Sequence, residues 1–234
     1  MFTRVWHATV AGLVLAALIL QVWIAIRVPG SPPSHAVGRL AGTAPGWRIA
    51  RVFSFFTIES NTLAALGAWL LALNPARDGR GWRVLRLDSL VGITVTGLVY
   101  GTVLSKVHEP HGWQETSTNI VLHYAVPILM VVGWLVFGPR PRITAGVVGS
   151  ALIWPALYLL YILIQGWFSK WYPYPFLDVI SDGYGRVLLN AVAVLVALTL
   201  VTVLFWWGDR VLPAGPGRHG TAGGGPAAEN VATR

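Results

Sequence analysis

The stretch that decides the fold is residues 53–73, FSFFTIESNTLAALGAWLLAL. It has the length of about 20 mainly apolar residues with which a helix crosses the hydrocarbon of a bilayer. Its first half nevertheless carries Thr57, Glu59, Ser60 and Asn61. Polar groups inside hydrocarbon cost free energy unless they find partners, so this cluster predicts a functional site. Successive residues of a helix turn by ~100°, which places Thr57 and Asn61 on one stripe and points Glu59 elsewhere.

The composition of the chain indicates a polytopic membrane protein. Hydrophobic residues make up 55% and charged residues 11%, and the mean hydropathy is +0.62, whereas soluble domains are about a quarter charged. The net charge of +8 comes from cations in short loops between apolar segments. These fit membrane orientation and anionic lipid, and nucleic acid is not expected as a partner. The chain has no cysteine, which excludes disulfides, thiolate metal sites and a cysteine nucleophile.

The pattern of apolar runs predicts an all-α fold, a bundle of six transmembrane helices with short loops over residues 1–212. Residues 213–234 are rich in Gly, Ala and Pro, which predicts a disordered tail. The loop aromatics Trp167, Phe168, Trp171, Tyr172 and Tyr174 are interpreted as interfacial anchors. The six expected spans cover about residues 5–26, 53–73, 87–104, 119–137, 143–164 and 186–207.

An even number of spans places both termini on one side of the membrane. That side carries ten of the Lys and Arg residues and the other side seven, so the positive-inside rule predicts that both termini are cytoplasmic. Arg outnumbers Lys fifteen to two, and Ala, Gly and Val are abundant, as in GC-rich bacterial genomes. The expected location is therefore the bacterial inner membrane.

The order of the spans brings several polar side chains to one depth. The second, fourth and sixth spans all begin at the outer face. At ~1.5 Å per residue, Thr57 lies ~9 Å and His123 ~6 Å below it. The predicted layer consists of Thr57, Asn61, Asn119, His123 and Asn190.

A threonine and a histidine at one depth favour acyl transfer or ester hydrolysis on a lipid substrate. The Thr57 hydroxyl is a weak nucleophile unless a base removes its proton, and the imidazole of His123 suits that role. The expected catalytic residues are Thr57 and His123. Asn61, Asn119 and Asn190 are the expected substrate-binding residues, as possible donors to the oxyanion.

Structural interpretations of the same residues stay open. Thr57 can bond the carbonyl of its own preceding turn, and the three asparagines can join neighbouring helices. A zinc site made of His108, His111 and His123 is a further alternative, although HEPH at residues 108–111 lacks the spacing of the HExxH zinc motif. The polar layer would also suit a bundle that binds or transports a small lipophilic ligand without cleaving it.

Three motifs, in this order, resemble the androgen-induced membrane-protein family of integral-membrane threonine hydrolases. They are FFTIESN around Thr57, NIVLHYAVP around His123 and YPFLD at residues 174–178. The resemblance implies a threonine nucleophile at Thr57 and a histidine partner at His123, acting on fatty-acid esters. It implies no metal and no organic cofactor. Neither the motifs nor the composition indicates an oligomeric state.

Overall fold

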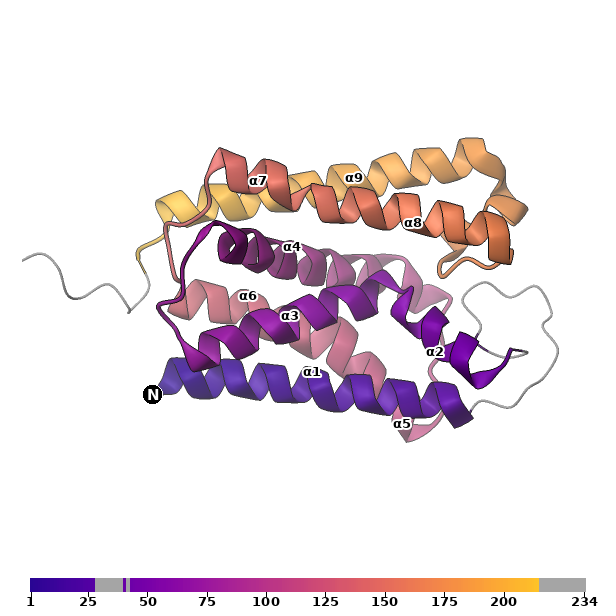
Figure 1. Ribbon diagram of the computed structural model, residues 1–234, viewed down its shortest axis with the longest axis horizontal. Coiled ribbons are helices and arrows are strands. Elements are labelled where there is room, and N and C mark those ends of the chain that lie inside the picture. Colours follow the sequence, from indigo (N-terminus) through magenta and orange to yellow (C-terminus); the bar gives the residue numbers. More distant parts are fainter. Residues whose placement is uncertain (28–39, 41–42, 215–234) are drawn as a thin grey trace, which may run out of the picture.

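The computed structural model describes residues 1–27, 40 and 43–214, and over these residues the chain forms a bundle of helices without a β-strand (Figure 1). Six helical spans within this part are long and apolar enough to cross a membrane, so the predicted all-α polytopic fold is confirmed. The spans are Phe2–Arg27, Phe56–Leu73, Arg80–Lys106, Gly112–Phe137, Ala145–Ser169 and Val179–Val211.

Several of these spans are composed of more than one element. The first is α1 (Phe2–Arg27), and a short helix α2 (Pro45–Phe53) precedes the second, α3 (Phe56–Leu73). The third joins α4 (Arg80–Thr102) to the 3-10 turn η1 (Leu104–Lys106). The fourth joins α5 (Gly112–Ile120), the π-helical turn η2 (Val121–Ala125) and α6 (Val126–Phe137). The last two are α7 (Ala145–Ala151) with α8 (Ile153–Ser169), and the 3-10 turn η3 (Pro175–Leu177) followed by α9 (Val179–Val211).

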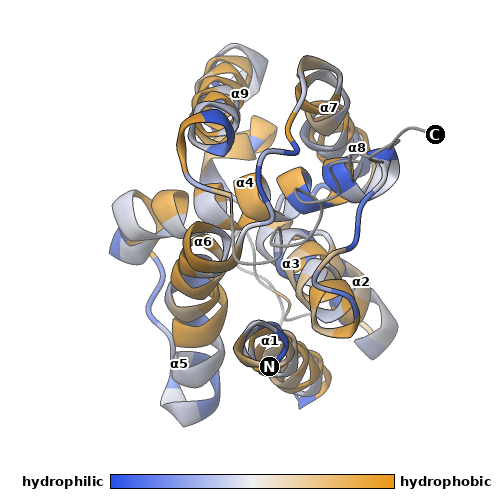
Figure 2. Ribbon diagram, turned by 90° about the vertical axis from the view of Figure 1, so that its left-hand side faces the viewer, coloured by the Kyte–Doolittle hydropathy of each residue, from blue (hydrophilic) through white to orange (hydrophobic). Residues whose placement is uncertain are grey.

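Helix α4 lies at the centre of the bundle. In the end-on view of Figure 2 it is surrounded by the other helices, and it packs against α3, α6, α7 and α9. It is also the most deeply buried of the six spans. The other spans present large apolar side chains outward, among them Leu15, Leu157 and Leu200. This pattern is expected where lipid replaces water as the solvent of the outer surface.

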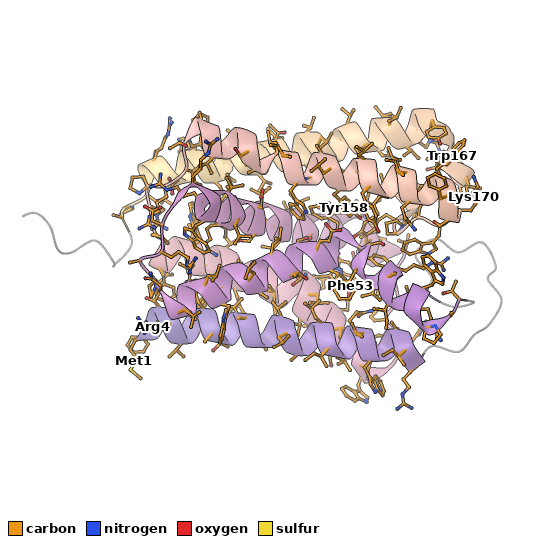
Figure 3. The ribbon with its side chains drawn as sticks, in the orientation of Figure 1. Met1, Arg4, Phe53, Tyr158, Trp167 and Lys170 are labelled. Carbon is orange, nitrogen blue, oxygen red and sulfur yellow. The ribbon has the colours of Figure 1, made fainter. Side chains whose placement is uncertain are left out.

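The two ends of the bundle are distinct. Met1 and Arg4 lie at one end and Trp167 and Lys170 at the other (Figure 3). Helix α9 ends at the same end of the bundle as that at which α1 starts, as an even number of spans requires (Figure 1). The second, fourth and sixth spans therefore all begin at the end that carries Lys170, which we call the outer end. The opposite end, which carries Met1, is called the inner end.

The structure corrects some of the predicted boundaries. Residues 53–73 are not one helix, because Phe55 has an extended backbone (φ −80°, ψ 129°) that separates α2 from α3. The predicted fourth span begins at residue 119, but α5 already begins at Gly112. Gly183, with φ 73°, kinks α9, and the predicted sixth span begins three residues after that kink. Of the predicted tail, residues 215–234 lie outside the described part of the chain.

Candidate functional site

Two tyrosine hydroxyls cap the start of α3, which places Thr57 in the first turn of that helix. The first N–H groups of a helix have no partner within the helix, and no side chain of α3 itself caps them. Here the N–H of Phe56 donates to the Tyr158 hydroxyl at 3.1 Å, and the N–H of Thr57 donates to the Tyr174 hydroxyl at 3.2 Å. The side chain of Thr57 is thereby fixed beside Tyr174, with their oxygens 3.5 Å apart.

The structure brings together the two residues that were predicted to act as a pair. The Thr57 hydroxyl lies 3.4 Å from Nε2 of His123, and Thr57 is only 7% exposed. Nucleophile and base are thus at the distance expected of such a pair before substrate binds.

The surroundings of His123 select the tautomer that a general base needs. Its Nδ1 lies 3.2 Å from the backbone carbonyl oxygen of Asn119. Because a carbonyl oxygen only accepts hydrogen bonds, Nδ1 carries the proton and the lone pair of Nε2 faces Thr57. The ring of Tyr100 stacks on the imidazole with centroids 4.0 Å apart and planes 29° apart, which holds its orientation.

His123 lies in a π-helical turn, and the sequence explains this turn. Pro127 has no N–H, so the α-helical hydrogen bond to the carbonyl of His123 cannot form. The helix widens at η2, where the N–H of Val126 bonds the carbonyl of Val121, five residues back. Such turns are frequent at functional sites, because they reorient a side chain within a continuous helix.

Asn61 satisfies the carbonyl that this turn leaves open. With i to i+5 bonding, the partner of the Leu122 carbonyl would be Pro127, which cannot donate. The side-chain amide of Asn61 donates to this carbonyl at 3.1 Å and to the carbonyl of Thr57 at 2.8 Å. The interpretation of Asn61 as an amide that joins two helices is therefore confirmed.

The other two predicted asparagines contribute differently. Asn119 fixes His123 through its backbone carbonyl and not through its side chain. Asn190 donates to the carbonyl of Phe176 at 2.9 Å, which pins the loop that carries Tyr174 onto α9. Contact of Asn61, Asn119 and Asn190 with a substrate stays a prediction.

A cavity opens from Thr57 into the bundle between α4, α8 and α9. It has about 620 Å³ of empty space, open solvent at its mouth included. Its polar lining residues are Thr57, Thr96, Tyr158 and Tyr174, and the remainder are apolar. A pocket that is mainly apolar with a few convergent polar groups is the usual form of a small-molecule site.

The sequence reasoning missed the role of the loop between α8 and α9. Trp167 and Phe168 are exposed, as interfacial anchors would be, but Trp171, Tyr172 and Tyr174 are buried, so that interpretation is wrong for these three. Gly166 makes room for the loop, because a Cβ there would lie 2.0 Å from the ring of Tyr172. The motif YPFLD, whose tyrosine is Tyr174, was the feature of the sequence that could have indicated a role for this loop.

The three histidines of the zinc alternative do not form a ligand cluster. Nδ1 of His108 lies 3.2 Å from the Tyr100 hydroxyl. Over residues 1–27, 40 and 43–214, no three His, Cys, Asp or Glu side chains gather as metal ligands would.

Comparison with models of protein families, with curated proteins and with solved structures finds no match to this chain. The assignment of a function therefore depends on the geometry of the site and on the three sequence motifs.

Proposed function

We propose that the protein is an integral-membrane hydrolase that cleaves lipid esters, with Thr57 as the nucleophile and His123 as the general base. The observation that carries the proposal is the 3.4 Å approach of the Thr57 hydroxyl to Nε2 of His123, where Thr57 also lines a mainly apolar cavity. The resemblance to the androgen-induced family supports the same two roles.

The reaction proceeds in two halves. The Thr57 oxygen attacks the ester carbonyl carbon while its proton passes to Nε2 of His123. Collapse of the tetrahedral adduct breaks the bond to the alcohol, which leaves with the proton of His123, and the acyl group stays on Thr57. A water molecule then attacks the acyl-threonine and gives a proton to His123. Release of the fatty acid returns that proton to Thr57.

Tyr174 is the side chain best placed to stabilise the oxyanion. Its hydroxyl oxygen accepts the N–H of Thr57, so its own proton remains available for donation. It already lies 3.5 Å from the attacking oxygen, and the oxyanion forms two bonds from that atom. The start of α3 adds the positive end of a helix dipole, which makes the phenol a stronger donor. We assign Tyr174 this role in preference to the asparagines, whose amides bond backbone carbonyls at Asn61 and Asn190.

The proposed location is the bacterial inner membrane, with both termini in the cytoplasm and the site in the outer half of the bilayer. The charge distribution between the loops supports this orientation. A substrate that resides in the bilayer would reach Thr57 without leaving the lipid.

A bundle that binds or transports a lipophilic ligand without cleaving it is the second candidate. The apolar cavity supports both functions. A binder has no need of a hydroxyl fixed against the unprotonated nitrogen of an imidazole, and this pairing favours the hydrolase.

The nucleophile is tested with an alkyl fluorophosphonate and the purified protein in lipid nanodiscs. We expect one covalent adduct on Thr57 by intact mass and peptide mapping, and none in Thr57→Ala. Thr62→Ala is the matched control, because Thr62 lies on the same helix with its hydroxyl on the carbonyl of Ile58. Equal labelling of the wild type and of folded Thr57→Ala would discard the assignment.

A further inference from the structure

The cavity extends from Thr57 in two directions. Towards the outer end it is lined by Leu104 and Leu177, and towards the middle of the bundle by Val95, Pro155 and Leu198. The inward arm is almost entirely apolar. An ester bound with its carbonyl at Thr57 would therefore place one substituent in each arm, with the hydrocarbon chain in the inner one.

Two stacked aromatic rings close the inner arm. The rings of Phe56 and Trp154 lie 4.8 Å apart with planes 18° apart. Phe56 lines the cavity at Thr57, whereas Trp154 lines a second, smaller cavity that is too narrow to admit a water molecule. The two cavities share Pro155 and Leu198, so the stacked pair forms the partition between them.

The partition is held firmly on its inner side. Nε1 of Trp154 donates to a carboxylate oxygen of Glu59 at 3.1 Å. The ring also packs against Gly92 so closely that a Cβ there would lie 2.8 and 2.9 Å from two of its carbons. Only glycine at this position leaves room for the indole, so close packing fixes the position of the Trp154 ring.

We propose that the inner arm is an acyl-chain pocket whose floor is the stacked pair Phe56 and Trp154, and that this floor restricts the enzyme to medium-chain acyl groups. The inference rests on the proposed function and adds its substrate class. Beyond the floor, the smaller cavity is lined by Asp88, Val91 and Thr202, which a longer chain would reach only after Trp154 had moved.

The length of the inner arm sets the longest acyl chain that the pocket can hold. A Cβ on Gly92, where the floor is seated, would lie 3.2 Å from Ser60, and Ser60 follows Thr57 by three residues of α3, or ~4.5 Å at 1.5 Å per residue. Tyr100, on which His123 stacks, lies eight residues of α4 from Gly92, or ~12 Å by the same measure. The floor therefore lies between ~4.5 and ~12 Å from the reacting pair. An extended chain advances about 1.2 Å per bond, as the ~3.5 Å of a three-bond peptide residue indicates. The arm therefore holds an acyl chain of at most about ten carbons.

The test is the dependence of kcat/KM on chain length for p-nitrophenyl esters from four to sixteen carbons, with the protein in nanodiscs. We expect kcat/KM to rise about fourfold per methylene within the pocket and to fall beyond about ten carbons. Trp154→Ala should move the maximum by about four carbons towards longer chains. Trp154→Phe keeps a ring without the bond to Glu59 and should retain the wild-type maximum.

An unchanged maximum in folded Trp154→Ala overturns the inference. Should that variant not fold, Leu198→Phe fills the arm above the floor and should move the maximum towards shorter chains. An unchanged maximum in Leu198→Phe overturns the inference equally.

A binding measurement separates this inference from the proposed function. Saturated fatty acids of six to sixteen carbons displace a fluorescent fatty acid from the inactive variant Thr57→Ala. A length limit near ten carbons without hydrolysis of any ester by the wild type would discard the hydrolase and keep the pocket. Hydrolysis with no limit on chain length would discard the pocket and keep the hydrolase.

Discussion

Two buried polar clusters lie at opposite ends of the same bundle, and they differ in how their polar atoms are satisfied. At the outer end, Thr57 contacts both His123 and Tyr174, and backbone groups fix these two aromatic side chains. At the inner end, His7 and Arg86 are 2% and 7% exposed. Their ring and guanidinium nitrogens have no hydrogen-bond partner within the described part of the chain.

Two other buried charged side chains at the inner end do have hydrogen-bond partners. Asp209 accepts the N–H groups of Arg142 and Ile143 at 2.6 and 2.7 Å. Arg140 donates to the carbonyls of Leu135 and Pro213, at the ends of α6 and α9. The outer cluster is therefore arranged as the proposed reaction requires, whereas the inner one leaves buried polar atoms unpaired at a cost in stability.

The largest expected difference between the clusters concerns their histidines. His123→Ala should lower kcat for ester hydrolysis by about 10³–10⁴-fold, because it removes the base that takes the Thr57 proton. His7→Ala, which removes a buried imidazole at the other end, should leave kcat within about twofold. Steady-state assays on both variants measure this contrast, and equal losses would show that neither histidine acts as the base.

The next effect compares the two tyrosines that cap α3. Tyr174→Phe should lower kcat by about 10²–10³-fold with little change in KM, as expected for the loss of a donor to the oxyanion. Tyr158→Phe also removes a hydroxyl from the start of α3 and from the cavity lining. The Tyr158 proton, however, is donated to the carbonyl of Ser54 at 3.0 Å.

The loss in Tyr158→Phe should therefore stay below about tenfold, the value of one neutral hydrogen bond. The same assay with both variants measures kcat and KM separately. Equal losses of kcat in the two variants would show that Tyr174 only caps α3.

The contrast between the clusters also marks what sequence can and cannot predict. The depth of Thr57 and His123 follows from counting residues along two apolar spans that begin at one face, and their 3.4 Å contact agrees with that count. The roles of Tyr174 and Tyr158 could not be predicted in this way. They depend on a loop that folds inward and on an antiparallel helix, whose register a hydropathy pattern does not contain.

The sequence also could not predict which polar side chains pair inside the bundle. The sequence shows that Pro127 follows His123 by four residues, but only the structure shows that Asn61 bonds the carbonyl left open in that turn. The predicted third span begins at residue 87, just after Arg86, whereas in the structure Arg86 lies within that span and is buried. Counting charges along the sequence shows where such a residue lies in the chain but not whether its side chain is buried.

At the inner end, replacing the unpaired guanidinium should stabilise the protein. Arg86→Met keeps the apolar stem and removes the buried charge, so we expect the free energy of unfolding to rise by about 1–3 kcal/mol. Arg83→Met is the control, because it removes a guanidinium that is paired with Asp78 and should lower stability slightly. Thermal melting in detergent measures both. A fall in stability for Arg86→Met would show that this guanidinium supports the bundle as the outer cluster's polar groups do.

The smallest effect concerns an ion pair in the inner loop, where charges are paired in water. Nε of Arg83 donates to Asp78 at 2.6 Å, and the N–H of Gly79 donates to the same carboxylate at 2.8 Å. The hydrogen bond from Arg83, with those of Gly79 and the charge of Arg142, holds the pKa of Asp78 well below its usual 3.8. A lowered pKa means that the stabilisation is complete above pH ~4 and is lost as the pH falls below that value.

Because the Asp78 side chain is 42% exposed, solvent screening limits this contribution to less than about 1 kcal/mol. Asp78→Asn should lower the melting temperature slightly at pH 7, and its difference from the wild type should shrink as the pH falls below ~4. Arg83→Gln should reproduce this change, since it removes the other half of the pair. A difference that persists undiminished near pH 2 would mean that Asp78 acts through the backbone of the turn and not through its charge.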